Sequence, residues 1–519
     1  MSILAQHIVI LPLLVPLVTG VLLVLMRGSA TPLRRTVSML GIQVLFGAAL
    51  TLLLQVADGT ILTYRLGDWP PPFGILLVAD RLGAMMVLLT SLLAVLVMIH
   101  AIHGSDRRGR QFHVLFQFQL FGLNGAFLTG DLFNLFVFFE VLLIASYGLL
   151  LHGCGPGRSR AGLHYVVINL VGSSLFLFAV GTLYGLLGTL NMADLSGRLA
   201  ELPAGDRALA DAAALLLLLV FALKAALVPL HLWLPGAYAS AGPAAAALFA
   251  IMTKVGAYAI LRFDTLILAP GAPSLTLLVG NLLLALGLAT IVAGTIGALA
   301  SRGLSFLVAY LVLVSSGTLL TAFGIGGVPA MAGGLYYLLH STLVGAALFL
   351  LTDKLIQTRG PYRDELSAGP ALPAANTLGG LFLVLALASA GLPPLSGFIG
   401  KVLILEAGLP TPWMPWLLGV VLITSLMNLT ALARAGSVLF FKTDRKAGAA
   451  TLPEPAYLVP VAALAAVLVL LVVYAGPIYD YASATANQLA APDTYIEAVL
   501  GDAEATAPGP GDAAGGRHE

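Results

Sequence analysis

The stretch Asn124-Gly-Ala-Phe-Leu-Thr-Gly-Asp-Leu-Phe-Asn-Leu-Phe-Val-Phe-Phe-Glu140-Val-Leu-Leu-Ile-Ala-Ser-Tyr-Gly-Leu-Leu-Leu151 decides the fold, because it places one acid inside an apolar helix. Between Leu132 and Leu151, Glu140 is the only acidic or basic side chain. At about 1.5 Å per residue it lies roughly 12 Å along the helix, near the middle of a bilayer core about 30 Å thick. A central charge costs roughly 2.5 to 3.5 kcal/mol on insertion scales, so we interpret this carboxylate as functional. The alternative is an acid that only holds helices together.

The composition is that of a polytopic membrane protein. Hydrophobic residues make up 59% of the 519 residues, charged residues only 9%, and the mean hydropathy is +0.99. These values exclude a soluble globular chain. The net charge of +1 gives no electrostatic basis for binding nucleic acid. The single cysteine, Cys154, cannot form an internal disulfide, and the N-terminus lacks the basic region of a cleaved signal peptide.

Hydropathy predicts an all-α protein with about fourteen transmembrane helices. The predicted spans are 3–26, 37–57, 80–102, 112–129, 132–151, 162–187, 208–229, 243–265, 275–299, 304–324, 329–352, 374–406 (interrupted), 413–441 and 455–478. Arginine and lysine gather in the odd-numbered loops, which the positive-inside rule places in the cytoplasm. We therefore expect a multi-pass protein of the bacterial plasma membrane with both termini outside.

Some polar residues between and at the ends of the spans have structural interpretations. Residues 58–78 alternate apolar and polar side chains around a Gly-Asp-Trp-Pro turn, which predicts a short external hairpin. Asp80, followed by Arg81, favours a helix cap or a terminal ion pair, and Asp131 favours the N-cap of the Glu140 helix. The tail 492–519 has no apolar period and is predicted to be disordered.

Two spans are predicted to break at prolines. Pro229 and Pro235 interrupt one, and Pro393 with Pro394 interrupts the other. A proline inside a helix frees the carbonyl four residues back, here that of Ala225 in the first span. In the second span the carbonyls of Ser389 and Ala390 are freed in the same way. Freed carbonyls inside a membrane need partners, so both breaks predict a polar lining, although each alone is also compatible with a simple kink.

Four bases join Glu140 near mid-depth in the predicted spans: Lys224, Lys254, His340 and Lys401. A lone buried histidine or lysine is readily explained by packing or by snorkelling. Five ionisable groups at one level instead predict a hydrated seam in which protons are exchanged. One carboxylate among nitrogen bases suits protons better than sodium, a hard cation that prefers several oxygen ligands. No motif predicts a cofactor or a metal site.

At these residues the chain resembles the proton-translocating antiporter-like subunits shared by NADH:quinone oxidoreductase and the multisubunit Mrp-type cation/proton antiporters. It is most similar to the Mrp D branch. Four motifs carry the resemblance, which extends over nearly the whole chain: the stretch Asn124 to Glu140, Pro229-Leu-His-Leu-Trp-Leu-Pro235, Thr253-Lys-Val-Gly-Ala-Tyr258 and Leu392-Pro-Pro-Leu-Ser-Gly-Phe398.

The resemblance implies two inverted five-helix repeats in which helices 7 and 12 are broken. The implied divisions are 1–111 for helices 1–3, 112–265 and 266–441 for the repeats, 442–491 for helix 14, and 492–519 for the tail. By position, Glu140 and Lys224 would be the input pair, Lys254 the central lysine, His340 the connecting histidine and Lys401 the residue of the second break. Gly236 stands where many respiratory members carry an acid, which argues against that branch.

Three functions remain open at this point. The first is a proton-conducting subunit of a monovalent cation (Na⁺)/proton antiporter that works with partner subunits. The second is a proton-pumping membrane subunit of an NADH:quinone oxidoreductase or membrane hydrogenase. The third is a structural helix bundle whose charges only organise partners. Neighbouring genes would separate the first two, because iron–sulfur and flavin subunits would indicate redox pumping.

Overall fold

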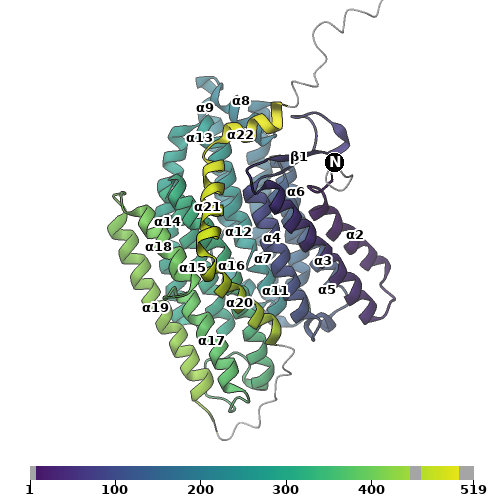
Figure 1. The fold of residues 1–519 in the computed structure, drawn as a ribbon, viewed down its shortest axis with the longest axis vertical. Helices are drawn as coiled ribbons and strands as arrows, with labels where there is room; N and C mark the ends of the chain where they lie inside the picture. Colours follow the sequence, from purple (N-terminus) through teal and green to yellow (C-terminus); the bar gives the residue numbers. More distant parts are fainter. Residues whose placement is uncertain (1–6, 445–457, 502–519) are drawn as a thin grey trace, which may run out of the picture.

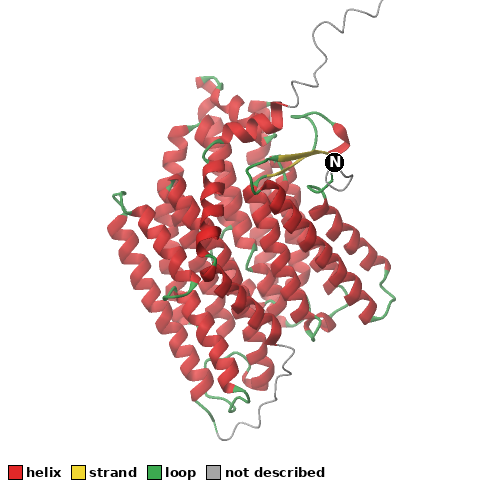
Figure 2. Ribbon diagram, in the orientation of Figure 1, coloured by secondary structure: helices red, strands yellow, loops and turns green. Residues whose placement is uncertain are grey.

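A bundle of roughly parallel helices forms the body of the protein (Figures 1 and 2). The structure is a computed structural model that describes residues 7–444 and 458–501. In the first half the helices are α2 (Leu11–Leu25), α3 (Thr31–Val56), α4 (Arg81–Ala101), α5 (Phe112–Leu128), α6 (Leu132–Leu151), α7 (Pro156–Leu187), α8 (Met192–Ala200), α9 (Ala204–Lys224), α10 (Trp233–Ser240), α11 (Pro243–Phe249) and α12 (Met252–Phe263). In the second half they are α13 (Ala269–Gly271), α14 (Pro273–Ala300), α15 (Leu304–Ile325), α16 (Gly327–Arg359), α17 (Ala375–Ala390), α18 (Ser396–Gly408), α19 (Met414–Phe441), α20 (Val459–Val473), α21 (Ala475–Leu489) and α22 (Pro492–Ile496).

Every predicted span overlaps a helix or an interrupted helix. In the part of the chain that the structure describes, nine helices are long and apolar enough to cross a membrane, or ten if α20 and α21 count as one span bent by 79°. The fold is therefore that of a multi-pass membrane protein, and the total of fourteen crossings stays a prediction. The last predicted span, 455–478, contains α20 and the start of α21, and its first three residues lie outside the described residues.

Both predicted proline breaks are present. α9 ends at Lys224 and resumes as α10 at Trp233, and α17 ends at Ala390 before α18 begins at Ser396. A third break, between α11 and α12, interrupts the predicted span 243–265, which still lies within one candidate membrane span, Pro243–Gly271. At this point the backbone N–H groups of Ala250 and Ile251 bond to carbonyls only three residues back, a tighter spacing than in an α-helix.

The predicted hairpin is present and marks one end of the bundle. Strands β1 (Leu62–Arg65) and β2 (Leu76–Ala79) pair antiparallel, with Leu62 opposite Ala79. We call this the hairpin end, and the opposite end, where the arginine-rich loops lie, the arginine end. His7 bonds to Tyr64 of β1 through its Nδ1 at 3.1 Å, and α22 lies at the same end (Figure 1). Both ends of the described chain thus lie at the hairpin end.

The expected disorder from residue 492 onward is wrong for 492–501. These residues form α22 and a π-helical turn, Glu497–Gly501. Tyr495 and Val499 are buried, so this segment packs against the bundle although its sequence shows no apolar period. Residues 502–519 lie outside the described residues.

α16 forms the centre of the bundle and carries His340. It packs against α4, α11, α15, α17, α18, α20 and α21. Nearly all of its side chains are buried. Helix α12, which carries Lys254, also lies in the interior of the bundle, because every residue from Met252 to Phe263 is buried. The predicted site residues on these two helices therefore lie in the interior, away from the lipid-facing surface.

Glycines let α14 and α15 pack backbone against backbone. A Cβ added at Gly317 of α15 would lie 2.8 Å from the carbonyl oxygen of Gly287 and 2.9 Å from the backbone N of Ile291. Small residues allow this close approach between membrane helices. The contact fixes α15, which carries Ser315 and Ser316, against its neighbour.

Gly317→Val should therefore lower the melting temperature of the detergent-purified protein. Inserting side-chain atoms into a packed interface costs about 1 to 3 kcal/mol. The matched control is Gly185→Val on α7, where an added Cβ would meet no atom within 4 Å. Equal melting temperatures for the two variants would contradict the close packing of α14 on α15.

Candidate functional site

Glu140 is held from α7. Asp131 caps α6 as predicted, since its Oδ1 accepts a hydrogen bond of 2.9 Å from the N–H of Asn134. Two turns further on, the half-buried Glu140 accepts a short hydrogen bond from the hydroxyl of Ser173. The Ser173 hydroxyl also lies 3.0 Å from the backbone oxygen of Asn169, one turn earlier on α7. The acid is therefore stabilised by a polar strip on α7.

Lys224 contacts the same strip. Its Nζ donates to Asn169 Oδ1 at 3.1 Å, and only 6% of the residue is exposed. Among the described residues Glu140 and Lys224 make no direct ion pair within 4 Å, and Lys224 bonds to Asn169. Asn169 and Ser173, four residues apart on one helix face, stand between the two charges.

The carbonyl that Pro229 was predicted to free, that of Ala225, has a hydrogen-bond donor in the structure. Ser316 Oγ on α15 donates to the Ala225 carbonyl at 2.5 Å. Within the break, the N–H of Val228 donates to Thr290 Oγ1 at 2.9 Å. Gly256 of α12 lies against this point, because a Cβ there would be 2.5 Å from the backbone N of Ala225. The end of α9, where Lys224 lies, and the start of α12, where Lys254 lies, are thus in direct contact.

Lys254 lies in the first turn of α12, immediately after the third break. It is fully buried, and its Nζ donates to Ser315 Oγ at 3.0 Å. Ser315 is adjacent in sequence to Ser316, the partner of the first break. Two consecutive serines of α15 therefore supply hydrogen-bond partners, one for the Lys254 ammonium and one for the backbone carbonyl that follows Lys224.

A small cavity lies between Ser315 and His340. Its volume is about 20 Å³, and its lining includes both side chains together with Ser341 and Ser389. A cavity needs roughly 10 to 15 Å³ to hold one water, so this space accommodates a single molecule with polar partners on several sides. Ser389 is one of the residues whose carbonyl the second proline pair was predicted to free.

His340 and Lys401 both contact the second break. His340 Nδ1 lies 2.9 Å from Ser396 Oγ, at the start of α18. Lys401 Nζ donates to the Ala390 carbonyl and to Ser425 Oγ, each at 2.8 Å. The Ala390 carbonyl is the other group that the proline pair was predicted to free. The Lys401 ammonium and the freed Ala390 carbonyl are therefore hydrogen-bond partners of each other.

Each of the five predicted residues lies next to a polar side chain that the sequence did not single out, and together they form a row of polar groups through the bundle, half-buried at Glu140 and buried at the four bases. These intervening residues are Asn169, Ser173, Ser315, Ser396 and Ser425. Serine, threonine and asparagine are visible in the sequence as polar residues within apolar spans. They could not be assigned to the site, because many such residues bond only to the backbone of their own helix. Ser174, for example, donates to Leu170 O four residues back.

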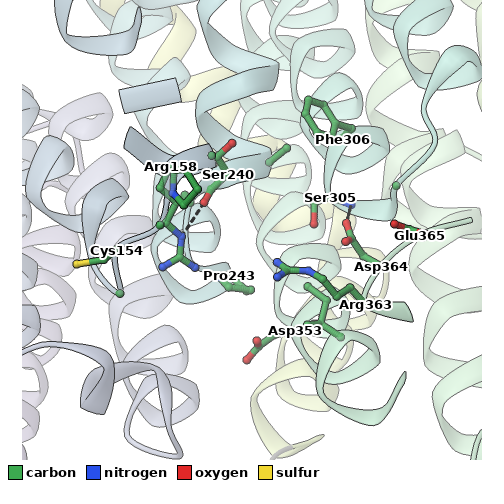
Figure 3. Close-up of a pocket in the computed structure, with 18 of the residues that line it drawn as sticks. Cys154, Arg158, Ser240, Pro243, Ser305, Phe306, Asp353, Arg363, Asp364 and Glu365 are labelled. Carbon is green, nitrogen blue, oxygen red and sulfur yellow. Dashed lines mark hydrogen bonds between the residues drawn. The ribbon is translucent and has the colours of Figure 1, made fainter. Parts of the chain in front are cut away.

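A larger cavity opens at the arginine end, with a volume of about 740 Å³ (Figure 3). Arg158, in the first turn of α7, donates to the Ser240 carbonyl at 3.0 Å, and both it and Arg363, from the loop after α16, extend into the cavity. Ser305 of α15 and Asp353 of α16 also line it, so the two helices that border the small cavity begin and end here. Asp353 is buried and bonds to His100 Nε2 at 2.8 Å. Ser305 lies about 15 Å along α15 from Ser315.

Comparison with known proteins identifies relatives over nearly the whole length. A family described as "NADH:quinone oxidoreductase/Mrp antiporter, TM" matches residues 129–428. The D subunit of a probable K(+)/H(+) antiporter of Rhizobium meliloti (strain 1021) is 41% identical over 95% of this chain and 98% of its own length. The D subunit of an Na(+)/H(+) antiporter of Bacillus subtilis (strain 168) is 37% identical over 95% of this chain and 99% of its own. In the solved Mrp complex of Dietzia sp. DQ12-45-1b, one chain superposes with a TM-score of 0.85 at 28% identity, covering 96% of this chain and 100% of that one.

The polar strip of α7 generates a prediction with a matched control. Ser173→Ala should slow proton movement at Glu140 by about tenfold to a hundredfold, because a hydrogen bond to a charged group contributes about 1.5 to 3 kcal/mol. Ser174→Ala, the next residue, should leave the rate unchanged, since Ser174 is exposed and bonds only to its own helix. Proton flux across vesicles containing the assembled complex measures both. Equal rates in the two variants would remove Ser173 from the site.

Proposed function

We propose, from the premise that this chain belongs to the NADH:quinone oxidoreductase/Mrp antiporter family of transmembrane proteins, that it is the proton-conducting D-type subunit of a multisubunit monovalent cation/proton antiporter. The observation that carries the proposal is the buried row from Glu140 to Lys401. Relatives named as antiporter D subunits match along almost the entire chain. The Dietzia Mrp complex supports a multisubunit assembly, so other subunits are expected as partners.

In the proposed route, protons pass from Glu140 and Lys224 to Lys254, then to His340 and Lys401. Glu140 and Lys224 are separated by Asn169, which can hold a charge in place but is a poor proton carrier. Transfer between them therefore requires water or a shift of the flexible Lys224 ammonium from Asn169 toward the acid. A proton on Lys224 also repels one on Lys254, because the two lysines flank the same backbone contact.

The step from Lys254 to His340 uses the small cavity. Ser315 contacts Lys254 and faces the cavity, so one water there would complete a path from Nζ through the hydroxyl to the imidazole. A hydroxyl both donates and accepts, and so does a neutral imidazole. His340 then reaches the second break, where Lys401 is anchored. The route is therefore a sequence of short polar steps separated by places where one water must enter.

The transported cation is not expected to bind along this row. The row contains one carboxylate and four nitrogen bases, whereas alkali cations prefer several oxygen ligands. The related D subunits are named for potassium in one case and sodium in the other. We propose that the row carries protons and that a partner subunit carries Na⁺ or another monovalent cation. This chain then acts as part of a secondary transporter and does not itself catalyse a chemical reaction.

The orientation and the repeats belong to the same proposal. The arginine end faces the cytoplasm by the positive-inside rule, so the hairpin end and both termini face outside the plasma membrane. Residues 112–265 and 266–441 form the two repeats, between the helices of 1–111 and the final helix within 442–491. The breaks after Lys224 and before Lys401 are then equivalent points of the two repeats.

The second candidate is a proton-pumping subunit of an NADH:quinone oxidoreductase, because the matched family includes both complexes. Gly236, where many respiratory members carry an acid, lies in open space with no atom within 4 Å of an added Cβ. The absence of that acid favours the antiporter. Proton movement that depends on NADH and quinone would favour the oxidoreductase.

Glu140→Ala should abolish cation-dependent proton exchange while the complex still assembles, because Glu140 is proposed as a protonation site and is only half-buried. The measurement is dissipation of a pH gradient on adding Na⁺ or K⁺ to vesicles that contain the complete operon products. Assembly is checked by co-purification of the partner subunits. Exchange at the wild-type rate in Glu140→Ala would refute the proposal.

A further inference from the structure

A buried ion pair closes the hairpin end of α12. Arg262 binds Asp80 with its two terminal guanidinium nitrogens, Nη1 to Oδ2 at 2.7 Å and Nη2 to Oδ1 at 2.8 Å. Asp80 also caps α4 by accepting from the N–H of Gly83 at 2.8 Å. The sequence indicated the cap correctly, but the ion-pair partner of Asp80 is Arg262, not the adjacent Arg81. Only 6% of Arg262 and 2% of Asp80 are exposed.

Aromatic rings enclose the pair on two sides. The Arg262 guanidinium carbon lies 5.5 Å from the ring centre of Tyr258 and 5.3 Å from that of Tyr495. Tyr495 belongs to α22, so the segment after Pro492 forms a lid over the arginine. The cavity at this point measures only about 10 Å³. This is at the lower limit of the space that one water requires.

The helix that precedes the lid, α21, is bonded to the start of α4. Tyr481 donates from its hydroxyl to the Arg81 carbonyl at 2.9 Å, and Gln488 donates from its amide to the Gly59 carbonyl at the same distance. The Gln488 side-chain oxygen accepts from the N–H of Arg81 at 3.2 Å. The final helices are thus bonded to α4 and to the loop before the hairpin.

The ion pair lies on the same side of α12 as the central lysine. Lys254, Tyr258 and Arg262 follow one another at intervals of four residues, which places them along one helix face. Arg262 is about 12 Å from Lys254 along the helix axis, toward the hairpin end. Between them, the Tyr258 hydroxyl is occupied by the Phe127 carbonyl, to which it donates at 2.8 Å. A proton that left Lys254 along this face of α12 toward the hairpin end would therefore meet Tyr258 and then Arg262.

We propose that the Asp80–Arg262 pair and its Tyr495 lid form a proton seal, which forces protons at Lys254 to leave through His340 and Lys401. A guanidinium stays protonated in proteins, so Arg262 can neither accept nor pass on an excess proton. The space beside the pair measures only about 10 Å³, so it leaves no room for the chain of waters that would carry a proton past Arg262. The seal rests on the proposed function, since it matters only if Lys254 carries protons.

The test is a cation-independent proton leak in vesicles containing the complete complex. The double variant Asp80→Asn/Arg262→Gln removes the charges together, so neither remains unpaired. An imposed pH gradient is followed without Na⁺ or K⁺, with choline chloride as the salt. The seal predicts decay at least several-fold faster than in the wild type. Adding Lys254→Met to the double variant should return the decay to the wild-type rate.

The control is Arg198→Gln, which removes an ion pair with Asp194 on α8 at the same end of the bundle. This pair is more exposed and should not affect the leak. Decay at the wild-type rate in the double variant would overturn the seal, and so would a leak that persists with Lys254→Met, since that indicates general damage. If the double variant does not assemble, Tyr495→Ala decides by the same two criteria. The leak is measured without Na⁺ or K⁺, so its result is independent of cation exchange. A wild-type complex that shows no cation/proton exchange would refute the proposed function but would not by itself refute the seal.

Discussion

A polar group in the middle of a bilayer has to find its partner within the protein, because hydrocarbon offers none. The whole interior of this bundle follows from that constraint. Each proline break frees backbone carbonyls, and at each break one of these carbonyls receives a side-chain donor from another helix. Ser316 supplies the donor for Ala225, and Lys401 supplies it for Ala390. A break that would be costly alone therefore becomes the place where a buried base can be held.

The three lysines show the same association of charge with helix ends. Lys224 is the last residue of α9, Lys254 lies in the first turn of α12, and Lys401 lies in the second turn of α18. Each finds a polar partner on an adjacent helix: Asn169, Ser315 or Ser425. These partners are neutral hydroxyl or amide groups, and within residues 7–444 and 458–501 none of the three lysines forms an ion pair with an acid.

Much of this architecture could be predicted from the sequence, for identifiable physical reasons. Pro229 and the Pro393–Pro394 pair marked two breaks because proline cannot donate a backbone hydrogen bond. Asp131 marked the start of the Glu140 helix because its carboxylate caps a free N–H. The break at Ala250 and Ile251 could not be foreseen, since neither proline nor glycine stands there. It arises from the packing of the surrounding helices.

The separation of Glu140 from Lys224 and the ordered segment after Pro492 were missed for a related reason. Hydropathy and spacing place residues at a depth, but they do not say which helix face meets which neighbour. Asn169 intervenes only because α7 packs against both α6 and α9. Tyr495 is buried only because α22 returns to cover Arg262, a contact between residues far apart in the chain. Such contacts are properties of the assembled fold.

The central claim is that one serial row carries protons from Glu140 to Lys401. The most direct test compares exchange rates of His340→Gln, Lys401→Ala and the double variant in vesicles with the complete complex. If the two residues act in series, the double variant should be little slower than the slower single variant, because groups that act as one unit are not additive. Losses that multiply in the double variant would mean two parallel routes and would contradict the serial row.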